Sequence, residues 1–265
     1  MTTPAWATVS PDALAQSQAL YTHLLTQLNA AGGWLSFADF MHAALYTPAL
    51  GYYSGGSTKF GAAGDFVTAP VISPLFAHVI ARQLAPYVAT NGGLVIEFGA
   101  GTGLLAQQLL STWQAMDCLP SRYVIVEVSG ELAARQADLL APWGERVEWW
   151  SSLPSGFTGV VVGNEVLDAM PVELVVKTTD GWLQRGVGCD DAGRWQWHDR
   201  PLPDSGALVD AVAQLPVDLP LAYVTEIGLA AQAFVTTLAE RLHHGLVLLI
   251  DYGFGAGEFY HPQRA

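Results

Sequence analysis

The sequence contains few positively charged residues. Its 265 residues include 11 lysines and arginines against 24 aspartates and glutamates, giving a formal net charge of −13. A protein that binds nucleic acid needs a basic surface to neutralise phosphates, and this composition does not supply one. We therefore expect no nucleic-acid partner. A cationic partner, such as a basic segment of another protein, suits an acidic surface better.

Cysteine, metal-ligand spacing and long apolar runs are also scarce. The two cysteines, Cys118 and Cys189, are far apart in the sequence, which favours a reducing compartment, and the seven histidines show no metal-ligand spacing. The longest apolar run, 246–250, is far shorter than the roughly 20 residues that span a bilayer. The first basic residue is Lys59, whereas secretory and mitochondrial targeting segments carry positive charge near their start. These absences predict a cytoplasmic protein without a membrane span or a metal.

The stretch 94–104 is the centre of the sequence pattern. Residues 94–96 are an apolar run typical of a buried strand, and the run ends in the acidic residue Glu97. Glycines follow at every second position: Gly99, Gly101 and Gly103. Glycines there let the backbone approach a ligand, and the helix predicted behind them offers free N–H groups. The spacing is typical of S-adenosylmethionine (SAM) sites, although 101–106 also satisfies a dinucleotide-binding pattern, so both ligands remain open here.

Further apolar runs predict a mostly parallel α/β sheet. They cover 123–128, 147–150, 159–163 and 245–251, with helical segments between several of them. Residues 172–198 break this rhythm with turn signals between alternating stretches, which predicts an antiparallel β insert at about 172–222. The first 90 residues read as a helical cap with a long loop that covers a ligand, and 91–265 as the Rossmann-like core.

Polar residues follow the predicted strands at their carboxyl ends, where ligands bind in open α/β sheets. Glu127 lies near the end of the second strand, at the position of a ribose-binding acid. Carboxylates after the fourth and fifth strands could orient a nucleophile or clamp a guanidinium. The candidates for cofactor binding are Asp65, Thr68, Glu97, Gly99, Gly101, Gly103, Glu127 and Asn164, and those for catalysis are Glu165, Asp168, Asp251 and Tyr252.

Several blocks of the sequence resemble the MidA-like SAM-dependent methyltransferase family. The blocks lie, in order, at residues 40–53, 64–70, 73–76, 97–103, 164–171, 251–254 and 258–264. This family includes the mitochondrial arginine methyltransferase that assists assembly of respiratory complex I. The resemblance implies a class I methyltransferase fold, SAM as the cofactor, and methyl transfer to arginine in a protein substrate. A complex I subunit or another basic, arginine-bearing segment is the implied partner.

The sequence departs from the family pattern at two places. Val71 stands where the family usually has Glu, and Ala77-His78 replaces a usual Gly-Glu. These departures favour an alternative function, in which the chain is a SAM-fold assembly factor that binds a partner with little or no turnover.

The end of the sequence predicts an incomplete sheet. Class I methyltransferase sheets finish with an antiparallel hairpin, and too few residues follow 251 to form two strands of about 5–6 residues with their connections. We therefore expect the C-terminal hairpin to be missing. An apolar strand left at an edge would lower stability or promote self-association.

Overall fold

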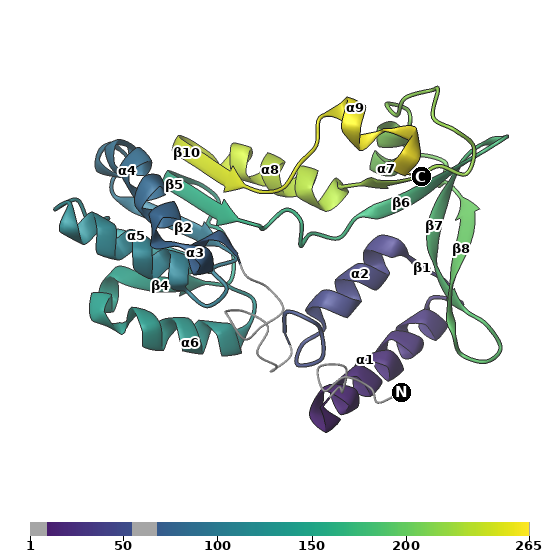
Figure 1. Cartoon of the computed structure of the whole chain (residues 1–265), viewed down its shortest axis with the longest axis horizontal. Helices are drawn as coiled ribbons and strands as arrows, with labels where there is room; N and C mark the ends of the chain where they lie inside the picture. Colours follow the sequence, from purple (N-terminus) through teal and green to yellow (C-terminus); the bar gives the residue numbers. More distant parts are fainter. Residues whose placement is uncertain (1–9, 55–67, 265) are drawn as a thin grey trace, which may run out of the picture. The chain divides into compact units, whose positions relative to one another are not determined.

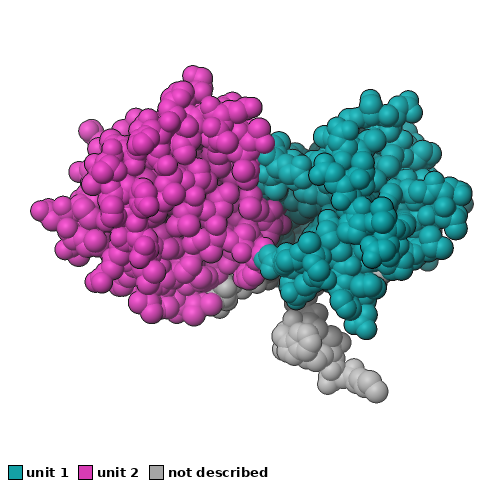
Figure 2. Space-filling view, turned by 90° about the horizontal axis from the view of Figure 1, so that it is seen from above, with its two compact units in different colours: residues 1–55, 170–233, 253–265 teal, residues 56–169, 234–252 magenta. Residues whose placement is uncertain are grey.

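The computed structural model describes residues 10–54 and 68–264 (Figure 1). They form two compact units, which Figure 2 shows in different colours. Unit 1 comprises residues 1–55, 170–233 and 253–265, and unit 2 comprises residues 56–169 and 234–252. The predicted domain division at residue 90 stays a prediction, and the units are described here one at a time.

Unit 2 contains a five-stranded sheet in which every pair of neighbours is parallel. The strand order is β10-β5-β2-β3-β4. The strands are β2 (Leu94–Phe98), β3 (Arg122–Val126), β4 (Val147–Trp150), β5 (Phe157–Asn164) and β10 (Leu242–Ile250). This crossover pattern is that of a Rossmann-like sheet, as the sequence predicted.

Helices cover both faces of this sheet. They are α3 (Ala69–Ile72), α4 (Pro74–Thr90), α5 (Leu104–Ala115), α6 (Gly130–Leu140), the 3₁₀ helix η2 (Ala141–Arg146) and α8 (Leu229–Arg241), whose last part belongs to unit 2. Strand side chains alternate between the two faces. Val95, Tyr123 and Val160 pack with α4 and α5, whereas Ile96, Val124 and Val161 pack with Leu238 of α8. The core of unit 2 is therefore three-layered.

Strand β10 lies at one edge of the sheet. Within the described residues it pairs with β5 and has no strand on its other side. Its side chains from Leu246 to Ile250 are half-buried rather than enclosed. Self-association through this edge stays a prediction.

Unit 1 contains a five-stranded antiparallel sheet formed by distant parts of the chain. Its strands are β1 (Leu35–Ser36), β6 (Glu173–Thr178), β7 (Gly181–Cys189), β8 (Trp195–Pro201) and β9 (Val224–Ile227). The described helices of this unit are α1 (Pro11–Ala30), α2 (Phe37–Tyr46), α7 (Ala207–Val212), α9 (Ala256–Phe259), the 3₁₀ helix η3 (Pro262–Arg264) and the start of α8. Strands β6, β7 and β8 are the predicted insert.

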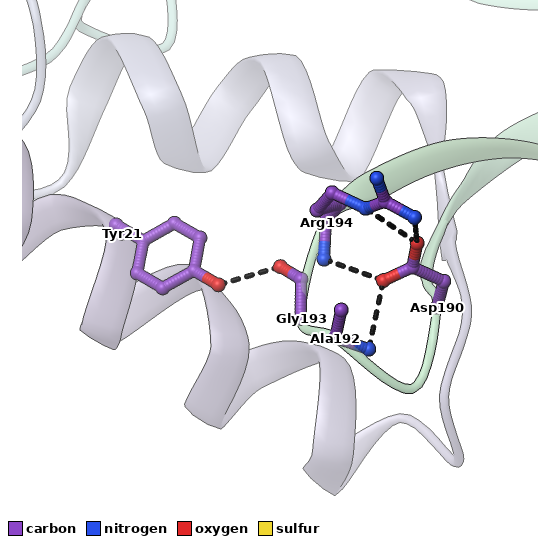
Figure 3. A network of polar contacts seen from close by, with 5 residues as sticks. All are labelled: Tyr21, Asp190, Ala192, Gly193 and Arg194. Atoms are coloured by element: carbon purple, nitrogen blue, oxygen red, sulfur yellow. Dashed lines mark hydrogen bonds and ion pairs between the residues drawn. The ribbon is translucent and has the colours of Figure 1, made fainter.

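Helix α1 is attached to the β7–β8 turn (Figure 3). The Tyr21 hydroxyl donates to the Gly193 carbonyl oxygen at 2.5 Å, while the Asp190 carboxylate accepts from the backbone N–H groups of Ala192 and Arg194 and from the Arg194 guanidinium. The Tyr21 ring also meets Trp195 edge to face, with ring centroids 5.8 Å apart. The N-terminal helices and the insert therefore belong to the same compact unit.

Candidate cofactor and acceptor site

The predicted site lies at the carboxyl ends of the parallel strands in unit 2. Strands β2 and β5 are neighbours at the centre of the sheet, and the chain order reverses between them. Ligands of open α/β sheets bind in the crevice at such a switch point. The segments after β2, β3, β5 and β10 carry eight of the twelve predicted site residues.

The glycine loop after β2 has the geometry of a ligand-binding turn. Gly99, Gly101 and Gly103 have φ angles of 64°, 53° and 83°, which glycine adopts at little steric cost. A Cβ at Gly99 would lie 3.1 Å from Val166, so a side chain there would crowd the segment after β5. Gly103 is the N-cap of α5, and no side chain caps this helix end. The first N–H groups of α5 are thus available to an anionic ligand group.

Glu127 lies directly after β3 and is half-buried. Its Oε1 accepts from the Ser129 N–H at 2.8 Å, and its Oε2 accepts from Gln136 Nε2 at 3.0 Å. Each carboxylate oxygen has a second lone pair, so these bonds fix the carboxylate and leave capacity for ligand hydroxyls. The geometry is suited to the predicted ribose contact.

Glu97 is placed differently from the other candidates. Its side chain is 1% exposed and accepts a hydrogen bond of 2.6 Å from the Tyr123 hydroxyl. Burial raises the pKa of this carboxyl to about 7, against the opposing effect of the Tyr123 hydrogen bond and with a further contribution from the charge of Glu127. Glu97 is therefore held inside unit 2, beneath the loop rather than on its surface.

An acidic segment follows β5 and contacts the end of β10. Asp251 Oδ2 accepts from the backbone N–H groups of Leu167 at 2.8 Å and Asp168 at 3.2 Å. The Glu165 N–H donates to the Ile250 carbonyl at 2.8 Å, and Glu165 has a φ of 53°, which is uncommon for a residue other than glycine. Asp251 therefore shapes this segment through its backbone.

The side chains of Glu165 and Asp168 take no part in the backbone bonds of this segment to Ile250 and Asp251. Tyr252 is 77% exposed, and its hydroxyl donates to Glu165 Oε1 at 3.3 Å. Burial, together with the charges of Asp251 and Glu165, raises the pKa of Asp168. The Glu165 charge raises the pKa of Tyr252 in turn. The four predicted catalytic residues are thus brought together, and they would favour a cationic ligand.

The remaining candidates for cofactor binding are Asn164, Thr68 and Asp65. Asn164 is the last residue of β5, where it pairs in register with Ile250. Thr68 is the N-cap residue of α3, with no side-chain capping bond. Asp65 lies outside the described residues.

Two side chains that the sequence analysis missed organise the site. Gln136 of α6 connects the glycine loop to Glu127, and Tyr123 of β3 binds Glu97. A glutamine in the middle of a helix and a tyrosine in an apolar strand carry no sequence signal for these roles. An open hollow of about 350 Å³, lined by residues 149–154, lies at the end of β4, next to the strand that leads to Glu127.

The described residues contain no group of three or more His, Cys, Asp or Glu side chains placed to hold a metal ion. None of the described helices combines the length and the hydropathy needed to cross a membrane.

The fold and the site together define a Rossmann-like protein with a nucleoside-type ligand site at its switch point. The family model described as "Putative S-adenosyl-L-methionine-dependent methyltransferase" matches residues 76–265, and the chain belongs to this family. The predicted family, fold class and cofactor are confirmed at this level.

A solved structure is similar to the whole chain. It is a COG1565 superfamily member from Burkholderia thailandensis bound to S-adenosyl-homocysteine, 47% identical, with a TM-score of 0.90, covering 100% of this chain and 69% of that chain.

The curated relatives are more distant. Protein arginine methyltransferase NDUFAF7, mitochondrial, of Danio rerio is 26% identical over 94% of this chain and 65% of its own length. Its homolog in Caenorhabditis elegans is 25% identical over 88% of this chain and 61% of its own length. The chain thus spans less than two thirds of the length of these curated relatives.

The predicted cytoplasmic location is contradicted, because these relatives are named as mitochondrial. The prediction depended on the lack of basic residues before Lys59. Such an absence does not determine a compartment.

Proposed function

We propose that this protein is a methyltransferase that uses SAM to methylate an arginine side chain of a protein substrate. The family supports SAM as the methyl donor, and the names of the curated relatives support arginine as the acceptor. The observation that carries the proposal is the acidic segment after β5. It holds Glu165 and Asp168 next to the glycine loop, with Val166 in contact range of the Gly99 position.

The glycine loop and Glu127, which follows β3, fit this donor. The uncapped N-terminus of α5 suits the carboxylate of SAM, and the fixed Glu127 carboxylate suits the two ribose hydroxyls. When bound, SAM supplies a methyl group on a positively charged sulfur. The hollow at residues 149–154 offers space beyond Glu127 for the base.

The acidic segment fits a guanidinium. Among the described residues, no lysine or arginine forms an ion pair with Glu165, Asp168 or Asp251. An arginine side chain stays protonated, so paired carboxylates are needed to hold it and to orient a nitrogen for attack. As the new N–CH₃ bond forms and the S–CH₃ bond breaks, the nitrogen loses a proton, which Glu165 or Asp168 can accept. The chemistry depends mainly on positioning and electrostatics.

A complex I subunit is a candidate substrate on the family resemblance alone. The alternative function, partner binding without turnover, is favoured by Val71, which lies in the short helix α3 where an acid is usual in the family. The same assay separates the two functions. Binding of SAM without methyl transfer to any protein of a cell extract would favour the alternative.

The test uses Glu165→Gln, which keeps the size of the side chain and removes its charge. Purified protein, labelled SAM and extract from cells lacking the protein would be incubated, and methylated arginines would be located by mass spectrometry. We expect turnover to fall by about 10–100-fold, because about 1.5–3 kcal/mol of charge-assisted hydrogen bonding would be lost. The affinity for SAM should be retained. Asp180→Asn, in the β6–β7 turn of unit 1, serves as the charge control. Normal arginine methylation by Glu165→Gln would refute the clamp.

A further inference from the structure

A fully buried glutamine connects three parts of the cofactor site. Gln136 lies on α6 with an exposed fraction of 0%. Its Nε2 donates to the Gly101 carbonyl oxygen at 2.8 Å and to Glu127 Oε2 at 3.0 Å. Its Oε1 accepts from the Trp149 indole N–H at 2.9 Å. All three partners belong to segments at the carboxyl ends of strands.

The partners fix the orientation of the amide. The Gly101 carbonyl can only accept a hydrogen bond, and the Trp149 indole can only donate. A flipped amide would place its oxygen against the Gly101 and Glu127 oxygens and its NH₂ group against the indole N–H. The bonds form only when Nε2 faces the glycine loop and Glu127. Gln136 also packs against the helix start, because a Cβ at Gly103 would lie 3.3 Å from its Cγ.

We infer that Gln136 is a positioning residue for the cofactor, and that it sets SAM affinity by holding the Glu127 carboxylate and the glycine loop in a fixed relation. This inference rests on the proposed cofactor contacts of Glu127. Since Gln136 is enclosed, it acts through its partners and does not touch the ligand. An ionised Glu at this position would lack the donor and would repel Glu127.

The charged groups around this position are few among the described residues. Glu127 faces it from the end of β3, and Glu97 is close enough to feel the Glu127 charge. On α6 itself, Arg135 is paired with Glu131 at 2.5 Å. A carboxyl group introduced at position 136 would therefore share its environment mainly with Glu127, and the two would compete for one proton.

The test measures the affinity for S-adenosyl-homocysteine by calorimetry, from pH 5.5 to pH 8, in the full chain and in Gln136→Glu. At pH 8 we expect the variant to bind about 10–100-fold more weakly, the loss for a charge-assisted hydrogen bond. As the pH falls, protonation restores a donor, so the affinity ratio between the two proteins should approach one. Gln232→Glu, which adds the same charge at an exposed position of α8, should match the unaltered chain throughout.

A second variant separates positioning from folding. Trp149→Phe keeps an aromatic ring but removes the indole donor together with part of the ring volume, so the Gln136 amide loses one orienting bond, and we expect a loss of several-fold in affinity. Equal affinity of Gln136→Glu and the unaltered chain at all pH values would overturn the inference. So would a loss that is the same at every pH and matches a lower melting temperature, or an unaltered chain that does not bind S-adenosyl-homocysteine. Binding with the expected pH response, but without arginine methylation, would support the inference and refute the proposed activity.

Discussion

The Glu97 side chain places an acid in the closed interior of unit 2. Its pKa of about 7 lies above the ordinary value of 4.5, so the folded protein binds a proton that the unfolded chain has already released. A raised pKa of this kind means that the contribution of Glu97 to stability is fully present below about pH 4.5 and is lost as the pH rises through about 7. The upper limit of this loss is about 3 kcal/mol, since each pKa unit corresponds to about 1.4 kcal/mol.

We predict that Glu97→Gln removes this loss of stability. Urea denaturation between pH 4.5 and pH 8 should give a flatter curve for the variant than for the unaltered chain, because the amide does not ionise but can still accept the Tyr123 hydrogen bond. Glu240→Gln, at an exposed position of α8, is the control and should leave the curve unchanged. Parallel curves for Glu97→Gln and the unaltered chain would show that Glu97 does not titrate as described.

Replacement of Glu127 tests the predicted contact between its carboxylate and the ribose of SAM. We predict that Glu127→Ala weakens SAM binding by about 1–3 kcal/mol, because two charge-assisted hydrogen bonds to the ribose would be lost. Calorimetry with SAM measures this change. Glu131→Ala, four residues further along and exposed, is the matched control. Unchanged affinity in Glu127→Ala would rule out the ribose contact.

At the scale of elements, the end of β10 shapes the segment after β5. Asp251 binds the N–H groups of Leu167 and Asp168, so it acts on the acidic segment through backbone bonds. We predict that Asp251→Ala lowers methyl-transfer turnover by about 10–100-fold, with a smaller effect on SAM affinity. Asp251→Asn, which keeps an acceptor oxygen, should recover most of the turnover. Steady-state kinetics on an identified acceptor would check both variants, and equal turnover in all three proteins would exclude this positioning role.

Several elements could be predicted from the sequence because their signals are local. The strand 147–150 matches β4, and the apolar run 159–163 lies inside β5 (Phe157–Asn164). The starts of α1, α2 and α4 follow from the serine caps at Ser10, Ser36 and Ser73. Boundaries were less accurate where helix and strand join directly. The strand expected at 245–251 begins earlier, at Leu242, directly after α8 ends at Arg241.

Contacts between distant segments could not be predicted in the same way. No local pattern indicates that residues 35–36 pair with β7, or that β9 joins β6, because such pairing depends on the register of segments far apart in the chain. The burial of Glu97 and the three hydrogen bonds of Gln136 also depend on contacts between separate segments of the chain. Motif spacing predicted residues at the carboxyl ends of the strands, and it missed the side chains that hold them in place.

At the scale of the whole molecule, the net charge of −13 predicts how a basic substrate would associate. Attraction between exposed charges is screened over about 8 Å at physiological ionic strength and over about 3 Å at 1 M salt. We predict that KM for a basic arginine peptide rises steeply between 50 mM and 500 mM salt, while KM for SAM changes little. A neutral arginine peptide is the control, and an equal salt response for both peptides would contradict electrostatic steering.

Unit 1 is formed by three separate segments of the chain, so its parts leave the ribosome at different times during synthesis. Leu35 of β1 pairs with Val187 of β7, about 150 residues later. At about 5–20 residues per second, the ribosome would need on the order of 8–30 s to deliver that partner. Through this interval α1 and α2 would be outside the ribosome without their sheet, while the parallel strands β2 to β5 were already available to pair. Helices α1 and α2, although made first, would therefore wait for most of the chain before their sheet forms, and their exposed apolar faces are where a chaperone would bind the growing chain.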